Sequence, residues 1–181
     1  QSGEMAGRMI EALMQETVAH RIFENIFLGG KDADVVDEQE GGPQLNIAYL
    51  LSASIYFDNR RILDNQPTRH IIGRDMTVQQ IEDIDRSEIC DLDKLNAAFQ
   101  LIDQARKENQ GILVHCQQGK DRSATVIAAY LVSRCQVSAE EAYKFIRSRR
   151  IIADTAEPYI EWVKANETQL QVPQHFPNEM L

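Results

Sequence analysis

The chain has 181 residues, of which 43% are hydrophobic and 26% are charged, a composition typical of a globular protein with one proper core. Its formal net charge of −9 argues against wholesale nucleic-acid binding, because a basic surface supplies most of the affinity in such complexes. The charge does not exclude a small anionic substrate, since a pocket can be locally positive on an acidic protein.

Neither a membrane span nor a cysteine framework is predicted. No apolar run approaches the roughly 20 residues that a membrane-spanning helix needs. The cysteines, Cys90, Cys116 and Cys135, are odd in number and lack CxxC spacing, so neither disulfides nor a zinc site are indicated. We expect a reducing compartment, most simply the cytoplasm. Delivery into another cell stays open, because such signals need leave no readable motif.

In chain order, the first expected element is an amphipathic helix from Glu4 to Thr17. Its apolar residues recur at helical spacing, and they are Met5, Met9, Ile10 and Leu13. We interpret this stripe as a packing face of the protein and not as a surface for a partner helix.

Short strands are predicted next. Those at 22–23 and 26–28 flank a turn, and a third covers 47–53, where apolar residues run together. Residues 34–45 and 57–69 have a loop-like composition, and the second of these leads to a possible short strand at 70–72.

Helices dominate the second half of the chain. Apolar residues at helical spacing predict a helix over 92–107, and a strand follows at 111–115. The helix expected over 122–134 is apolar nearly all round and should be buried. Ser138 and Glu141 have the spacing of a capping box for a helix to about residue 149. A last helix follows Pro158, with burial expected for Tyr159, Ile160 and Val163.

Strands that alternate with helices predict a single α/β domain with a central, mostly parallel twisted sheet flanked by helices. Ligands of such sheets bind beyond the carboxyl ends of the strands. Cys116 directly follows the strand at 111–115, so the sequence places it at such an end.

The stretch from His115 to Ser123 joins this strand to the next helix. A strand that turns into a helix leaves backbone N–H groups without an intrachain partner, and these donors together with the helix dipole favour an anion. Gly119 permits a tight loop with a positive φ, and Arg122 offers a planar guanidinium for two phosphate oxygens. The stretch therefore predicts a cradle for a dianion.

Cys116 is expected at the bottom of this cradle, where the same donors lower the pKa of its thiol and make it a nucleophile. Ser123 is placed to donate a hydrogen bond to the sulfur, and His115 is expected to orient the loop. The pattern GxxxxGK[ST] is absent, so NTP binding has no support, and no cysteine-protease signature surrounds Cys116.

The nine residues HCQQGKDRS match HCxxGxxRS, the signature of the cysteine-dependent protein phosphatases. The chain resembles the dual-specificity branch of that family in particular, because the flanking segments are similar to it in order and spacing. The resemblance runs from about Arg21 to Trp162. It implies a cysteine-phosphatase fold with a catalytic domain over 21–170, a helical extension over 1–20 and a tail over 171–181.

The resemblance also implies a two-step hydrolysis of phosphate monoesters that needs no metal or other cofactor. Cys116 attacks phosphorus while Arg122 and the loop amides hold the equatorial oxygens. The residues implied to bind the substrate are Gln117, Gln118, Gly119, Lys120 and Asp121.

The family takes its general acid from an aspartate that lies about thirty residues before the cysteine and just after a strand. Asp85 fits this position, and Asp83 is the second candidate. We interpret Asp91 and Asp93 as charges that the helix dipole favours at the start of a helix.

Two features depart from many protein-directed members. Lys120 and Asp121 stand where those members carry small or apolar residues, and Gly-Lys resembles the loop of the phosphoinositide 3-phosphatases. A lysine there can meet a second phosphate on an inositol ring, or an acidic side chain beside a phosphotyrosine, and Asp121 would partly offset its charge.

The segment RIIADT, residues 150–155, is the second departure. Many members carry Arg-Pro and then Pro-Asn there, and the asparagine supports the phosphate loop, but Ile151 and Thr155 differ from that pattern. We interpret Arg147, Arg149 and Arg150 as a solvated helix end that favours the C-terminal dipole.

We therefore expect dephosphorylation of phosphotyrosine and phosphoserine or phosphothreonine in proteins, with a phosphorylated protein as the partner and no nucleic acid. The alternative is a phosphoinositide or inositol-phosphate phosphatase with the same chemistry. A phosphate-binding pseudophosphatase is the third hypothesis, against which the intact Cys116, Arg122 and Asp85 argue. The placement of Asp85 and the Arg122-Ser123 end of the loop fit a rhodanese-like sulfurtransferase or an arsenate reductase less well. No oligomeric state is predicted.

Overall fold

The computed structural model describes residues 2–14, 18–30, 47–53, 77–80, 92–116 and 118–172. Several predictions from the sequence lie outside these residues: the loops at 34–45 and 57–69, the strand at 70–72, the tail beyond 172, Asp83, Asp85, Cys90, Asp91 and Gln117. In the part of the chain that is described, no helix is both long enough and apolar enough to cross a membrane.

In the part of the chain that the structure describes, five strands form one sheet in the order β1-β2-β5-β3-β4. β1 pairs antiparallel with β2, and the other pairings are parallel, so the mostly parallel sheet is confirmed. The bounds are β1 His20–Phe23, β2 Ile26–Gly29, β3 Ile47–Ser52, β4 Thr77–Gln80 and β5 Gly111–His115.

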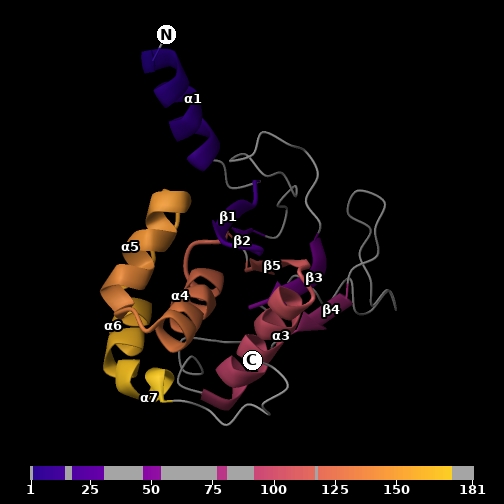
Figure 1. Ribbon diagram of the computed structural model, residues 1–181. Coiled ribbons are helices and arrows are strands. Elements are labelled where there is room, and N and C mark those ends of the chain that lie inside the picture. The colour runs from indigo at the N-terminus through magenta and orange to yellow at the C-terminus, as the bar shows by residue number, and fades with distance from the viewer. Residues whose placement is uncertain are drawn as a thin grey trace.

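The helices are α1 Ser2–Leu13, α3 Leu92–Lys107, α4 Arg122–Cys135, α5 Ala139–Arg149, α6 Glu157–Ala165 and α7 Glu167–Gln171. α3 and α4 both contact β5 and each other, and α5, α6 and α7 gather around α4 (Figure 1). Every residue from Ser123 to Ser133 is buried, which confirms the expectation for α4. At the start of α5, the Ser138 hydroxyl accepts the N–H of Glu141 at 3.1 Å, as the capping signal predicted.

The carboxyl ends of four strands meet at one edge of the sheet. Gly29 and Ser52 are both paired with His115, and Ser52 is paired in turn with Gln80. The residue after His115 is Cys116, so the predicted site lies at the edge where β2, β3 and β4 also end.

Two features differ from the sequence prediction. The resemblance implied a strand just before Asp85, but the residue pattern did not place β4 at 77–80: among the described residues β4 is an edge strand paired with β3, and its sequence TVQQ lacks the apolar run that reveals a central strand. The packing-face interpretation of the N-terminal stripe is wrong for Met5 and Ile10, which are 66% and 49% exposed. α1 stands at one end of the molecule, away from the sheet (Figure 1).

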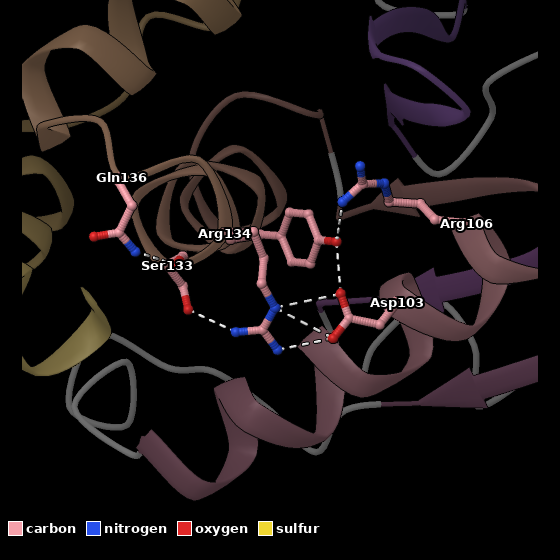
Figure 2. Close-up of polar contacts among 6 residues, drawn as sticks. Asp103, Arg106, Ser133, Arg134 and Gln136 are labelled. Carbon is pink, nitrogen blue, oxygen red and sulfur yellow. Dashed lines mark hydrogen bonds and ion pairs between the residues drawn. The ribbon is translucent and has the colours of Figure 1, made fainter. Parts of the chain in front are cut away.

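A polar cluster joins α3 to α4 (Figure 2). The Asp103 carboxylate on α3 accepts the Tyr130 hydroxyl at 2.7 Å and pairs with Arg134 at 2.8 Å, and both partners are on α4. Arg106, also on α3, donates to the same Tyr130 oxygen at 2.8 Å. The cluster fixes the position of α4, the helix that begins at the predicted anion site.

Replacement of Tyr130 by phenylalanine removes the hydroxyl that Asp103 and Arg106 share. We expect the free energy of unfolding to fall by about 1–3 kcal/mol, because two partly buried groups lose a partner. Urea unfolding measures this. Ser148→Ala is the control, since that hydroxyl donates to Phe145 O on an exposed helix face, and its effect should stay within about 0.5 kcal/mol. Equal midpoints for both variants would contradict the role of the cluster.

Candidate active site

The predicted anion site is a short loop between the central strand and a buried helix. β5 ends at His115, Cys116 follows with 3% of its surface exposed, and α4 begins at Arg122. β5 is the middle strand of the sheet, so both neighbouring strands constrain where its carboxyl end lies. The sequence predicted this strand, turn and helix with the bounds that the structure has, apart from one added residue at the end of α4.

Hydrogen-bond donors converge on the Cys116 sulfur. The Ser123 hydroxyl oxygen lies 3.0 Å from it, and backbone N–H groups of Ser123, Gly119 and Lys120 also bond to it. Burial is the largest single influence and raises the pKa of the thiol, because it penalises the charged form. The hydrogen bonds from Ser123 and the loop amides together outweigh burial, so the pKa of Cys116 is lower than that of an ordinary thiol.

Gly119 lets the loop lie against the end of β2. Its φ is +68°, in the left-handed region, as its place in the sequence predicted. A Cβ at this position would lie 2.6 Å from the carbonyl carbon of Gly29 and 2.9 Å from Nη2 of Arg150. Both the backbone conformation and the space therefore require glycine here.

Arg150 holds the outer side of the loop. Its Nε donates to the Gly119 carbonyl at 3.1 Å and its Nη2 to the Gln118 carbonyl at 3.0 Å. The side chain is 0% exposed, so the interpretation of Arg150 as part of a solvated helix end was wrong, although Arg147 and Arg149 are exposed. A guanidinium can enter the interior when carbonyl oxygens accept its N–H groups, as they do here.

The segment that departs from the family pattern makes further hydrogen bonds to the loop. The Thr155 hydroxyl donates to the Lys120 carbonyl at 2.6 Å, and the Ala156 N–H donates to Asp121 Oδ1 at 2.8 Å. The carbonyls of Gln118, Gly119 and Lys120 are thus all bound by side chains from one segment. The sequence did not predict which side chains would support the loop, because Thr155 does not match the asparagine that the resemblance implies there.

The other predicted site residues lie as follows. His115 is 1% exposed, and its carbonyl accepts the N–H of Ala53 at 2.7 Å. Gln118 is exposed, and Lys120 and Arg122 are half-buried. Their roles at a bound phosphate stay predictions. Gln117, Asp83 and Asp85 lie outside the described residues.

A second row of contacts stabilises the start of α4. The Thr125 hydroxyl donates to the Asp121 carbonyl at 2.7 Å and lies 2.9 Å from the Tyr143 hydroxyl on α5. The contacts of Thr125 join the start of α4 to α5, in addition to the hydrogen bonds between the loop and the segment after α5. The arrangement is a buried, low-pKa thiol beneath a loop whose amides point inward, which suits a nucleophile facing an anion.

Comparison with known proteins places this site in a family context. The family model "Dual specificity phosphatase, catalytic domain" matches residues 26–169. Human dual specificity protein phosphatase 16 is 32% identical over 130 residues, which are 72% of this chain and 18% of that protein. The chain spans 18% to 58% of the lengths of the first curated relatives that it matches.

Solved structures agree on the fold. The crystal structure of human DUSP28 has a TM-score of 0.67 at 21% identity, over 87% of this chain and 98% of that one. The structure of PTPMT1 in complex with PI(5)P has a TM-score of 0.62 at 21% identity, over 84% of this chain and 97% of that one. At these identities the likeness is one of fold alone.

The pKa of Cys116 can be read from alkylation. We expect the iodoacetamide reaction of Cys116 to reach half its maximal rate at a lower pH than that of Cys135, whose thiol pKa is raised by burial. Ser123→Ala should move the Cys116 midpoint to higher pH, because it removes a donor to the thiolate. Mass spectrometry follows each cysteine separately. A common midpoint for both cysteines would contradict the site geometry.

Gly119→Ala should weaken the binding of inorganic phosphate at least about tenfold, because the loop must move away from Gly29. Titration calorimetry measures this. Gly7→Ala is the matched control: nothing lies within 4 Å of a Cβ there, so phosphate binding should not change. Equal affinity in the two variants would show that the loop tolerates the side chain.

Proposed function

Because the chain belongs to the dual specificity phosphatase catalytic-domain family, we propose that it hydrolyses phosphate monoesters through a phosphocysteine formed on Cys116. The observation that carries the proposal is the convergence of the Ser123 hydroxyl and the backbone N–H groups of Ser123, Gly119 and Lys120 on the Cys116 sulfur. A thiolate in that setting is already charged when a phosphate arrives. Arg122 and the inward amides supply the compensating positive charge.

In the first step, the Cys116 sulfur attacks phosphorus in line with the ester oxygen. An S–P bond forms, the P–O ester bond breaks, and the departing oxygen takes a proton from Asp85. In the second step, the Asp85 carboxylate accepts a proton from water as the water oxygen attacks phosphorus. The S–P bond then breaks, inorganic phosphate leaves, and Ser123 stabilises the returning thiolate by donating a hydrogen bond.

The register of the sheet supports Asp85 as the acid. Gln80, the last residue of β4, is level with Ser52 and so with His115, two strands away. Two strand spacings amount to about 9.6 Å. Asp85 follows Gln80 by five positions, and an extended chain of that length spans up to about 17 Å. Because β4 ends at the same edge as β5, this length is sufficient for Asp85 to reach a phosphate at Cys116.

We propose phosphotyrosine and phosphoserine or phosphothreonine in proteins as substrates, with the catalytic domain over residues 21–170. The curated relatives named as dual specificity protein phosphatases support this choice. The chemistry needs a reduced thiol, which fits a reducing compartment such as the cytoplasm, and it needs no metal or other cofactor.

A phosphoinositide is the second candidate, and Lys120 is the observation that favours it. Its carbonyl is fixed by Thr155 while its side chain is half-buried at the loop. A cationic side chain on a fixed backbone can bind a second phosphate on the inositol ring of such a substrate. PTPMT1, which shares the fold, has been solved with PI(5)P.

Hydrolysis of para-nitrophenyl phosphate against pH, with EDTA present, tests the mechanism. We expect the wild type to turn over and Cys116→Ser to be inactive. With phenyl phosphate, whose leaving group is more basic than para-nitrophenoxide, Asp85→Asn should lose about 10²–10⁴-fold in rate. The rate should fall as pH rises through the pKa of Asp85, since the acid must be protonated, and this fall should vanish in Asp85→Asn. Turnover by Cys116→Ser would refute the nucleophile.

A panel of phosphopeptides and soluble inositol phosphates then separates the two substrate classes. Lys120→Met keeps the length of the side chain and removes its charge. If phosphopeptides are the substrates, kcat/KM for peptides without an acidic residue beside the phosphorylated one should stay within about threefold of wild type. A selective loss with inositol phosphates carrying two neighbouring phosphates would favour the second candidate.

A further inference from the structure

The first strand of the sheet reaches the phosphate loop through Arg150. Nη1 of that side chain donates to the Val18 carbonyl at 2.6 Å and lies 2.7 Å from Nδ1 of His20. Its Nε and Nη2 hold the carbonyls of Gly119 and Gln118. Arg150 is 0% and His20 is 1% exposed, so a single buried guanidinium spans the distance between β1 and the loop.

The chemistry of the contact fixes the state of the histidine. A guanidinium has N–H donors and no acceptor, so Nδ1 of His20 must accept the hydrogen bond. The ring is therefore neutral and carries its proton on Nε2. A protonated ring would have hydrogen on both nitrogens, and would bring a second positive charge against Arg150 in a buried place.

We propose that His20 is a positioning residue for the phosphate loop. Its neutral imidazole fixes Nη1 of Arg150, which orients the rest of the planar guanidinium toward the Gln118 and Gly119 carbonyls. Because the opposite side of the same peptides carries the amides that face Cys116, a correctly placed Arg150 keeps those amides directed at the sulfur. The proposal rests on the proposed function only in taking this loop as the phosphate site.

Arg150 is a charged group in direct contact with His20, and it therefore responds to the protonation of His20. β1 packs against β2, which has no ionisable side chain, and against α5. On α5, Tyr143 is buried near Thr125, and the other ionisable residues are exposed: Glu140, Glu141, Lys144, Arg147 and Arg149. On β1 itself, Arg21 donates to the Glu24 carbonyl.

A consequence for pH dependence follows. Protonation of His20 replaces an acceptor by a charged donor, so Nη1 loses the hydrogen bond to His20. Arg150 then holds the loop carbonyls less firmly, phosphate binding weakens, and the thiol pKa rises toward its ordinary value. Loss of activity at low pH would thus have a component from His20 besides protonation of the thiolate.

Two substitutions at His20 test this. Leucine removes the acceptor, whereas the side-chain oxygen of asparagine can accept in the place of Nδ1 and does not titrate. For His20→Leu we expect the dissociation constant of inorganic phosphate to rise about tenfold and the alkylation midpoint of Cys116 to move to higher pH. His20→Asn should resemble wild type near pH 7 and should lose the His20 component at low pH.

Ile22→Val is the matched control, because it removes packing from the same strand at a residue that is 2% exposed. It should change neither readout. The proposal is overturned if His20→Leu matches wild type, if His20→Asn is as impaired as His20→Leu, or if Ile22→Val is equally impaired.

A measurement on the unaltered protein covers the case in which His20→Leu fails to fold. Nitrogen-detected NMR of the histidine rings should show His20 neutral with its proton on Nε2 at pH 7, and a proton on Nδ1 would overturn the proposal. Neither alkylation nor phosphate binding needs turnover. If both behave as expected and no phosphoester is hydrolysed, the proposed function fails and the role of His20 stands.

Discussion

A loop that directs its amides inward must satisfy its carbonyls on the outside. The N–H groups of Gly119 and Lys120 face the Cys116 sulfur, so the carbonyls of this stretch point into the protein behind the site. Buried carbonyls without partners are costly, and an irregular loop has no neighbouring strand to provide them. Side chains must therefore bind these carbonyls, and the position of the loop depends on where those side chains lie.

Segments far apart in the chain take part in that arrangement. Arg150 and Thr155 follow α5, and Arg150 also binds Val18, which lies 132 residues earlier in the chain. Thr155 stands in the segment that departs from the pattern implied by the resemblance, and its hydroxyl donates to the Lys120 carbonyl. This segment therefore supports the loop although its sequence departs from that pattern.

Local signals predicted the elements that carry the chemistry. The helix over 92–107 and the strand over 111–115 follow from periodicity and apolar runs, and Gly119 follows from the need for a positive φ. Arg150 was misread because its charge predicts solvent, while its partners come from distant parts of the chain. The resemblance implied a strand before Asp85, but the residue pattern did not give the place of β4, because an edge strand needs few apolar residues. Contacts between distant segments leave no pattern in a short window of sequence.

Arg150 is synthesised after the loop that it holds, and this order has a consequence for the nascent chain. The ribosome releases the motif from His115 to Ser123 well before it releases residues 150–156. A nascent chain that ends before Arg150 has Cys116, Gly119 and the strand before them, yet it lacks the donors that hold the loop carbonyls. Until those residues emerge, such a chain carries the complete signature without the side chains that hold the loop, and these arrive with the segment that follows α5.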